Sequence, residues 1–228
     1  MISEYTIKAR LAPTALAAPP LLLLCNALFN IRADQWIESA AMIALFGKGT
    51  AMVAIVFLMM QANRLIGLEI FQRLVSQDEL NFPTSRWLVA TNTEMSSAQR
   101  QSIDKKLQRD FQIGLMPANM SDSPEVRRHN ADLVGRIRLF VGSPRKLLRY
   151  NIEYGFFRNL IGASPLVLVV GLINAFLYSK SLLPAWAYQL SLAYAILAGV
   201  LVCLARPIIE RLGIQYARAL FQAYLDKK

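Results

Sequence analysis

The residues best suited to chemistry are seven cationic side chains between residues 127 and 149. They are Arg127, Arg128, Arg136, Arg138, Arg145, Lys146 and Arg149, and Asp132 is the one acid among them. Arginine binds phosphate through two parallel hydrogen bonds and keeps its charge. Two of the basic pairs fall at predicted helix starts, where free backbone N–H groups also favour anions. The stretch therefore predicts a surface for a phosphate-bearing ligand.

Two interpretations of this basic stretch stay open. In the first, the ligand is soluble, and nearby aromatic rings stack on its bases. Those rings belong to Tyr150, Tyr154, Phe156 and Phe157. In the second, the charge only retains the region on the cytoplasmic side, where it contacts anionic lipid headgroups.

Catalytic and metal-binding patterns are missing from the sequence. No GxSxG, HExxH, CxxC or glycine-rich dinucleotide motif occurs, and His129 is the only histidine. Its neighbours, Arg128 and Asn130, favour a surface position. Cys25 and Cys203 lie far apart in apolar runs, which predicts buried structural thiols rather than a disulfide. We therefore expect neither an enzyme nor a protein that depends on a cofactor or metal.

The elements that position the basic stretch include four apolar segments. The chain has 228 residues, of which 55% are hydrophobic and 18% charged, as expected for a membrane protein with one modest water-exposed region. The predicted spans are Leu11–Ile31, Ser39–Met60, Ile161–Ser179 and Leu182–Ala205. Pro13, Pro19 and Pro20 predict a kink in the first span, which lacks a signal-peptide cleavage site and is expected to be retained.

Three polar residues within these spans are candidates for lining a pore. They are Asn26, Lys48 and Asn174. Asn26 could instead form a hydrogen bond between helices. Lys48 lies within the membrane, lies in a re-entrant segment, or extends its ammonium group to the outer interface.

The predicted fold is an all-α membrane protein with a helical region between spans two and three. Its parts are residues 1–62 (two spans), 63–160 (a cytosolic sensor region), 161–206 (two spans) and 207–228 (an amphipathic tail helix). The second span is expected to continue as a helix to Leu80. Ser96 and Ser123 predict helix starts, Gly142 a helix end, and Arg86–Thr93 a short strand or extended linker. The tail helix packs on the preceding stalk or lies on the membrane surface.

The distribution of Lys and Arg predicts the orientation. Residues 61–160 carry fifteen of them, the N-terminus two and the tail five, whereas the two outer loops carry only Arg32 and Lys180. Because cationic loops stay on the cytoplasmic side, both termini and the central region are predicted to be cytoplasmic.

Two sequence elements resemble a family of small bacterial multi-span proteins. They are Pro83-Thr84-Ser85-Arg86-Trp87 and, just before the third span, Asn151-Ile152-Glu153-Tyr154-Gly155-Phe156-Phe157-Arg158-Asn159-Leu160. The chain is thereby similar to four-span effectors of antiphage defence systems paired with a nucleotidyltransferase, of CBASS or Hailong type. The first element departs from the family pattern at Ser85, where threonine is expected.

The resemblance implies a homo-oligomeric pore or membrane disruptor in the bacterial inner membrane. The activity of this pore or disruptor would be controlled by a nucleotide or oligonucleotide that the partner enzyme makes. The residues of the second element themselves predict an elbow between sensor and span, at which Gly155 permits a bulky neighbour to approach the helix. This elbow is either purely structural or couples ligand binding to the gate, through Tyr154, Gly155, Arg158 and Asn159. A non-channel membrane scaffold, whose basic region binds anionic lipid or a protein partner, is the alternative.

Overall fold

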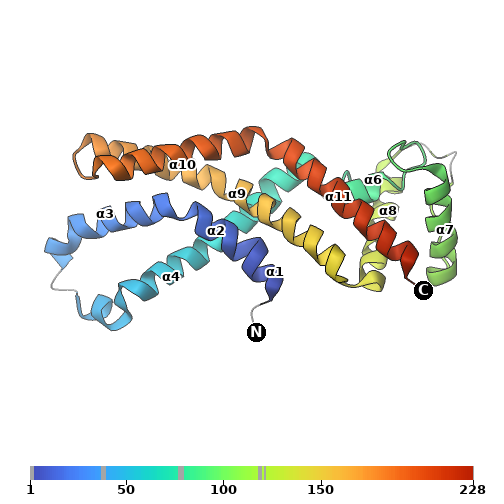
Figure 1. The fold of residues 1–228 in the computed structure, drawn as a ribbon, viewed down its shortest axis with the longest axis horizontal. Helices are drawn as coiled ribbons and strands as arrows, with labels where there is room; N and C mark the ends of the chain where they lie inside the picture. Colours follow the sequence, from blue (N-terminus) through green and yellow to red (C-terminus); the bar gives the residue numbers. More distant parts are fainter. Residues whose placement is uncertain (1–2, 37–39, 77–79, 118–119, 121, 228) are drawn as a thin grey trace. The chain divides into compact units, whose positions relative to one another are not determined.

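The described residues of the chain are all-helical in the computed structural model. The structure describes residues 3–36, 40–76, 80–117, 120 and 122–227. For residues 29–52 it describes the backbone elements but not the side chains. Helices make up 83% of the chain, and the described residues contain no strand. Among the described residues, three helices are long and apolar enough to cross a membrane, or four if a bent N-terminal pair forms one span. The all-α membrane class is thus confirmed, while the number of spans and their topology stay predictions. The chain forms two compact units (Figure 1).

Unit 1 comprises residues 1–71 and 155–205. Its N-terminal segment is a series of short helices: α1 (Glu4–Thr6), the π-helix η1 (Ile7–Leu11), α2 (Ala12–Ala17) and α3 (Pro19–Trp36). The axis bends by 51° between Glu4–Ala17 and Pro19–Leu28. The predicted kink is confirmed, because Pro19 and Pro20 have no N–H to continue the helical bonding across the break.

The second predicted span lies in α4 (Ala40–Ile66), which includes Lys48. Helical structure continues through the π-helix η3 (Gly67–Gln72) and α5 (Arg73–Ser76). This continuation agrees with the predicted extension of the second span as a helix. The side chain of Lys48 is outside the described residues, so the alternatives for its placement are not decided.

The third predicted span belongs to α9 (Arg145–Ser179), a single helix of 35 residues. It contributes residues 145–154 to unit 2 and 155–179 to unit 1. The predicted elbow between the sensor region and the span is wrong, because the helix continues unbroken through Tyr154–Gly162. Helical structure is kept here despite Gly155 and Gly162, and even Pro165 is accommodated inside α9, because tertiary packing overrides weak local propensity.

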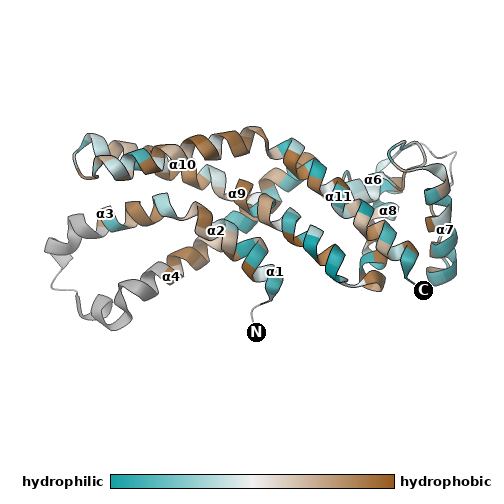
Figure 2. Ribbon diagram, in the orientation of Figure 1, coloured by the Kyte–Doolittle hydropathy of each residue, from teal (hydrophilic) through white to brown (hydrophobic). Residues whose placement is uncertain are grey.

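The last predicted span corresponds to α10 (Ala185–Cys203). Its residues, like those of the second part of α9, are mostly hydrophobic (Figure 2). Cys203 is exposed and Cys25 half-buried, so the expectation of two buried thiols is wrong. Cys203 ends α10 on a face that unit 1 does not cover.

Unit 2 comprises residues 72–154 and 206–228. Around one core it packs α6 (Pro83–Arg86), α7 (Ser97–Phe111), α8 (Pro124–Val141), the start of α9 and α11 (Ala205–Asp226). The most deeply buried apolar side chains are those of Ile103, Leu107, Ile137, Leu220, Phe221 and Tyr224. The tail helix α11 supplies half of these six, so it is an integral part of unit 2 rather than a separate segment.

The predicted helix boundaries of unit 2 are confirmed at both serines. Ser96 and Ser123 accept hydrogen bonds from backbone amides three residues further on, and Pro124 occupies the first turn of α8. Gly142 ends α8 with a φ of 72°, a backbone conformation that glycine adopts at little cost.

The prediction of a strand or extended linker at Arg86–Thr93 is wrong. Arg86 ends α6, and the chain continues in tight turns in which the amides of Leu88, Val89 and Asn92 each bond a carbonyl three residues earlier. Trp87, Leu88 and Val89 are all buried. Turns permit three consecutive side chains to enter the core, whereas a strand would direct alternate ones to opposite faces.

Candidate functional site

The basic surface of unit 2 begins on α8, an amphipathic helix. Its buried side holds Val126, Asn130, Leu133, Val134, Ile137 and Val141. Arg128 and Arg136 lie on the opposite, exposed side, with Asp132 midway between them at helical spacing. These two arginines form no ion pair within the described residues.

Two other cations of α8 are already engaged within unit 2. Arg127 donates two hydrogen bonds to the carboxylate of Asp122, at 2.6 Å and 2.5 Å. These bonds hold the pKa of Asp122 below its usual value, and they raise that of Arg127. The Arg138 guanidinium lies 5.6 Å from the ring centre of Tyr216. Both side chains therefore already form contacts within the protein, so a ligand would have to bind alongside these contacts or replace them.

The first turns of α9 hold the remaining three predicted cations. Arg145 and Lys146 are exposed and have no ion pair within the described part of the chain. Arg149 pairs with Glu153 at 3.0 Å. Four of the seven predicted residues thus remain open to an anion: Arg128, Arg136, Arg145 and Lys146.

The predicted base-stacking aromatics are largely used within the protein. Tyr154 is buried and packs edge-on against Phe82, with ring centres 5.4 Å apart. Phe156 and Phe157 pack against each other at 5.3 Å. Tyr150 is half-buried against the unit 2 core. The prediction that Tyr154 stacks on a ligand base is therefore wrong for this conformation.

The predicted gate-coupling residues of unit 1 lie where the N-terminal segment contacts α9. A Cβ added at Gly155 would lie 2.8 Å from the Tyr5 hydroxyl and 3.0 Å from the Ala9 Cβ, so a larger residue here requires the Tyr5 side chain to move. Asn159, fully buried, donates a hydrogen bond of 2.6 Å to the Ala9 carbonyl. Arg158 is half-buried on the same helix. Gly155 and Asn159 therefore hold the segment against α9.

The predicted pore residues differ in their surroundings. Asn26 is exposed and lines a cavity of about 310 Å³ together with Ser181 and Trp186. Asn174 is fully buried and donates to the Pro20 carbonyl at 3.0 Å and to the Ser191 hydroxyl at 2.8 Å. Asn174 therefore bonds helices together in this conformation.

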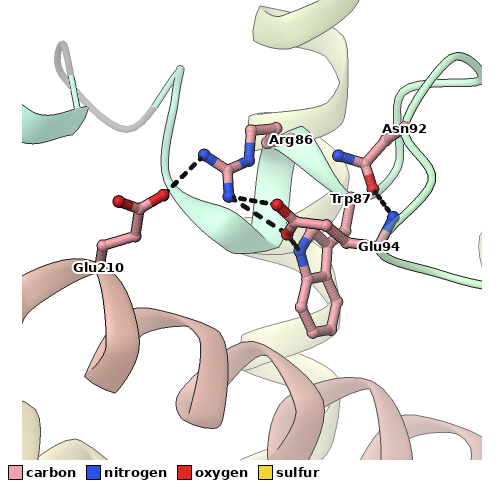
Figure 3. A network of polar contacts seen from close by, with 5 residues as sticks. All are labelled: Arg86, Trp87, Asn92, Glu94 and Glu210. Carbon is pink, nitrogen blue, oxygen red and sulfur yellow. Dashed lines mark hydrogen bonds and ion pairs between the residues drawn. The ribbon is translucent and has the colours of Figure 1, made fainter. Parts of the chain in front are cut away.

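A polar network that sequence reasoning missed fixes the turns after α6. Arg86 binds both carboxylate oxygens of Glu94, at 2.8 Å and 3.1 Å, and reaches Glu210 of α11 at 3.3 Å. The Trp87 indole N–H donates to the same Glu94 carboxylate (Figure 3). Spacing alone gives no signal for this network, because Glu210 lies 124 residues from Arg86.

Two further residues complete the packing of unit 2. Arg100 donates to the carbonyls of Trp87, Ala90 and Asn92 at 3.3 Å, 2.8 Å and 2.7 Å. His129, predicted to be a surface residue, is half-buried, and its Nε2 bonds the Gly114 carbonyl at 2.9 Å. The first element of the family resemblance thus lies in a tightly bonded structural region.

Comparisons with protein families, curated proteins and solved structures found no match to this chain. Within the described residues, no three histidine, cysteine, aspartate or glutamate side chains come together as a metal site would require. The candidate site is therefore interpreted from its own residues.

Proposed function

We propose that the protein is an oligomeric membrane channel or membrane-disrupting effector of antiphage defence, controlled by a nucleotide or short oligonucleotide. The ligand binds unit 2 on the cytoplasmic side, and a nucleotidyltransferase encoded alongside supplies it. Support for the orientation comes from the excess of Lys and Arg in unit 2 and in both terminal segments.

One observation carries the proposal: α9 holds both exposed cations and a membrane-spanning segment. Arg145 and Lys146 occupy its first turn, where helix N–H groups add to the attraction for an anion. The same unbroken helix contains the apolar stretch from Ile161 to Ser179. A phosphate bound at the first turn thus contacts a helix that enters the membrane. If the phosphate binds the open and closed states of the channel unequally, it shifts the equilibrium between them.

Homo-oligomerisation is part of the proposal. The α10 helix carries large apolar side chains that unit 1 leaves exposed, including Trp186, Ile196 and Leu197. Either lipid or another copy of the chain can cover such side chains, so their exposure is compatible with an oligomer as well as with a single copy in lipid. Asn174 is bonded within one subunit, so we propose that the pore is lined by other residues where several copies meet.

A membrane scaffold is the second candidate, and one observation favours it. Leu139 is 87% exposed on α8, on the same side as Arg128 and Arg136. A helix with exposed leucine and arginine suits the surface of an anionic bilayer. Unit 2 would then bind headgroups rather than a soluble ligand.

The test is ion flux from liposomes that contain the purified protein, with cyclic nucleotides or short oligonucleotides added. The sensor variant is Arg145→Glu with Lys146→Glu, because neither side chain forms an ion pair with any residue that the structure describes. Its matched control is Lys105→Glu with Arg211→Glu, which changes the net charge equally at two exposed positions on α7 and α11. We expect ligand-controlled flux in the wild type and the control, and at least a tenfold weaker response in the sensor variant.

Two results would decide against parts of the proposal. An unchanged ligand response in the sensor variant removes the first turn of α9 as the binding surface. If no ligand changes flux, and the protein instead binds anionic vesicles through Arg136 and Leu139, the scaffold is the better description.

A further inference from the structure

Three buried asparagines hold the proline-broken N-terminal segment of unit 1. Each is at most 1% exposed, and each donates its side-chain N–H₂ group to that segment. The bonds run from Asn159 to the Ala9 carbonyl (2.6 Å), from Asn63 to the Thr14 hydroxyl (3.2 Å) and from Asn174 to the Pro20 carbonyl (3.0 Å). The first two hold the part before the break at Ala18, and the third holds the part after it.

The sequence of the segment explains why its backbone needs an outside donor. In an α-helix the Ala9 carbonyl accepts from the amide of residue 13, but Pro13 has no N–H. The chain forms a π-helical turn here, in which the Ala12 amide bonds the Ile7 carbonyl five residues earlier. Asn159 supplies the donor that Ala9 lacks. Single π-helical turns of this kind are frequent at functional sites.

The hydrogen bonding that attaches this segment is incomplete. The side-chain oxygens of Asn63, Asn159 and Asn174 are buried without a hydrogen-bond partner among the described atoms. Each asparagine therefore holds the segment by its amide N–H₂ group alone and gains nothing from its oxygen.

The break itself has the properties of a hinge. Ala17 ends α2 and Pro19 begins α3, so only Ala18 separates the two helices. Pro19 and Pro20 cannot donate to the carbonyls four residues earlier, so two successive backbone bonds are missing across the break. Because these two bonds are already absent, the backbone angles at Ala18 can change without breaking a hydrogen bond from Pro19 or Pro20.

We propose that residues 4–17 form a releasable gate element, which turns about Ala18 and is held on α9 by the Asn159 bond and on α4 by the Asn63 bond. The consequence for ion flow rests on the proposed channel function, whereas the release is a property of unit 1 alone. The clamped state is the one in this structure. Asn159 acts as a positioning residue, because it holds a helix rather than contacting an ion.

A disulfide between positions 9 and 155 tests the release directly. A Cβ at Gly155 would lie 3.0 Å from the Ala9 Cβ, a few tenths of an ångström below the usual disulfide spacing of about 3.5–4.5 Å. Ala9→Cys with Gly155→Cys, made with Cys25→Ser and Cys203→Ser, therefore locks the segment once the Tyr5 ring moves aside. Gly171→Cys with Ala195→Cys is the matched control, because its Cβ separation of 3.1 Å locks α9 to α10 instead.

The first measurement is the rate of disulfide formation under a mild oxidant, which needs no channel activity. Replacing Asn159 with Leu removes the bond to Ala9, so we expect the 9–155 disulfide to form several-fold more slowly and the 171–195 disulfide to form at an unchanged rate. Equal rates for the 9–155 pair with and without Asn159 would overturn the clamp. This arm decides the inference even if wild-type protein shows no flux and the proposed function fails.

The second measurement is nucleotide-dependent flux from liposomes before and after oxidation. We expect the 9–155 disulfide to abolish the change in flux and a reductant to restore it, while the 171–195 disulfide leaves the response intact. A full response from protein with the 9–155 disulfide closed would show that the segment is not the gate element.

Discussion

A close crossing between two helices of unit 1 predicts that one added methyl group there destabilises the protein. At this crossing Gly162 of α9 faces Gly67 of η3. A Cβ added at Gly162 would overlap the Asn63 carbonyl and lie 2.7 Å from the Gly67 amide nitrogen. Carbon–heavy-atom contacts are most favourable near 3.5–4.0 Å, so Gly162→Ala requires the helices to separate by about 1 Å.

The magnitude follows from three contributions to the free energy of unfolding. Overpacking of this kind costs ~1–3 kcal/mol. The Asn63–Thr14 and Asn159–Ala9 hydrogen bonds flank the crossing, and losing one such bond in a membrane interior costs roughly 0.6 kcal/mol. The alanine regains ~0.8–1 kcal/mol of helix propensity. The net expectation is a destabilisation of about 0.6–2.8 kcal/mol, or a roughly three- to hundred-fold smaller folding equilibrium constant.

Unfolding of the purified protein in mixed detergent micelles measures this free energy. Gly199→Ala in α10 is the matched control, because a Cβ there meets nothing within 4 Å. That variant should be unchanged or more stable by up to ~1 kcal/mol. If Gly162→Ala is as stable as Gly199→Ala, the two helices do not cross at this contact.

The double variant gives a sharper test of the same contact. A Cβ at Gly67 would lie 2.7 Å from the Arg158 carbonyl oxygen, so Gly67→Ala alone also forces the helices apart. Once the first substitution has separated the helices, the second substitution causes little further separation. We therefore expect Gly67→Ala with Gly162→Ala to cost clearly less than the sum of the single changes, whereas additive costs would indicate two independent sites.

Three further predictions concern unit 2. Ser96→Ala removes the cap of α7 and should cost about 1 kcal/mol in thermal unfolding, whereas Ser97→Ala should change little. Arg127 lowers the folded pKa of Asp122 below its ordinary 3.8, so this pair stabilises the fold above that pH and the contribution is lost as the pH falls through the folded value. The melting temperatures of wild type and Asp122→Asn should thus differ by a constant amount well above pH 3.8 and begin to converge as the pH falls below it, meeting only below the folded pKa. A difference that stays constant throughout contradicts the pairing. Arg100→Met leaves three carbonyls without their donor and should cost about 2–3 kcal/mol, which Arg100→Lys should not recover, because one ammonium cannot reproduce the guanidinium fork.

Features of this fold that depend on local chemistry could be predicted from the sequence. The cap at Ser96, the end of α8 at Gly142 and the bend at Pro19 each follow from one residue and its immediate neighbours. The buried side of α8 follows from helical periodicity. These features require no knowledge of what the helix packs against.

Features that depend on distant partners could not be predicted. Periodicity does not show that Arg86 joins Glu94 and Glu210, or that α11 completes the core of unit 2. The element around Gly155 was expected to form an elbow at which Gly155 permits a neighbour to approach closely; the close approach is found, but the elbow is not. The structure uses Gly155 for close approach within a continuous helix.

The asparagines show why the candidate site was only partly predictable. Asn174 was predicted to be a pore residue because it is a polar residue within a span, and Asn159 a gate residue because it lies at the inner interface just before a span. Both donate to backbone carbonyls of the N-terminal segment, 154 and 150 residues away, and Asn63 makes the corresponding bond to a side chain. A buried amide in a span therefore predicts that a bond exists, but not its partner. The prolines of that segment explain one of these partners: the Ala9 carbonyl has no amide donor four residues later, because Pro13 lacks an N–H, and it receives one from Asn159 of a neighbouring helix.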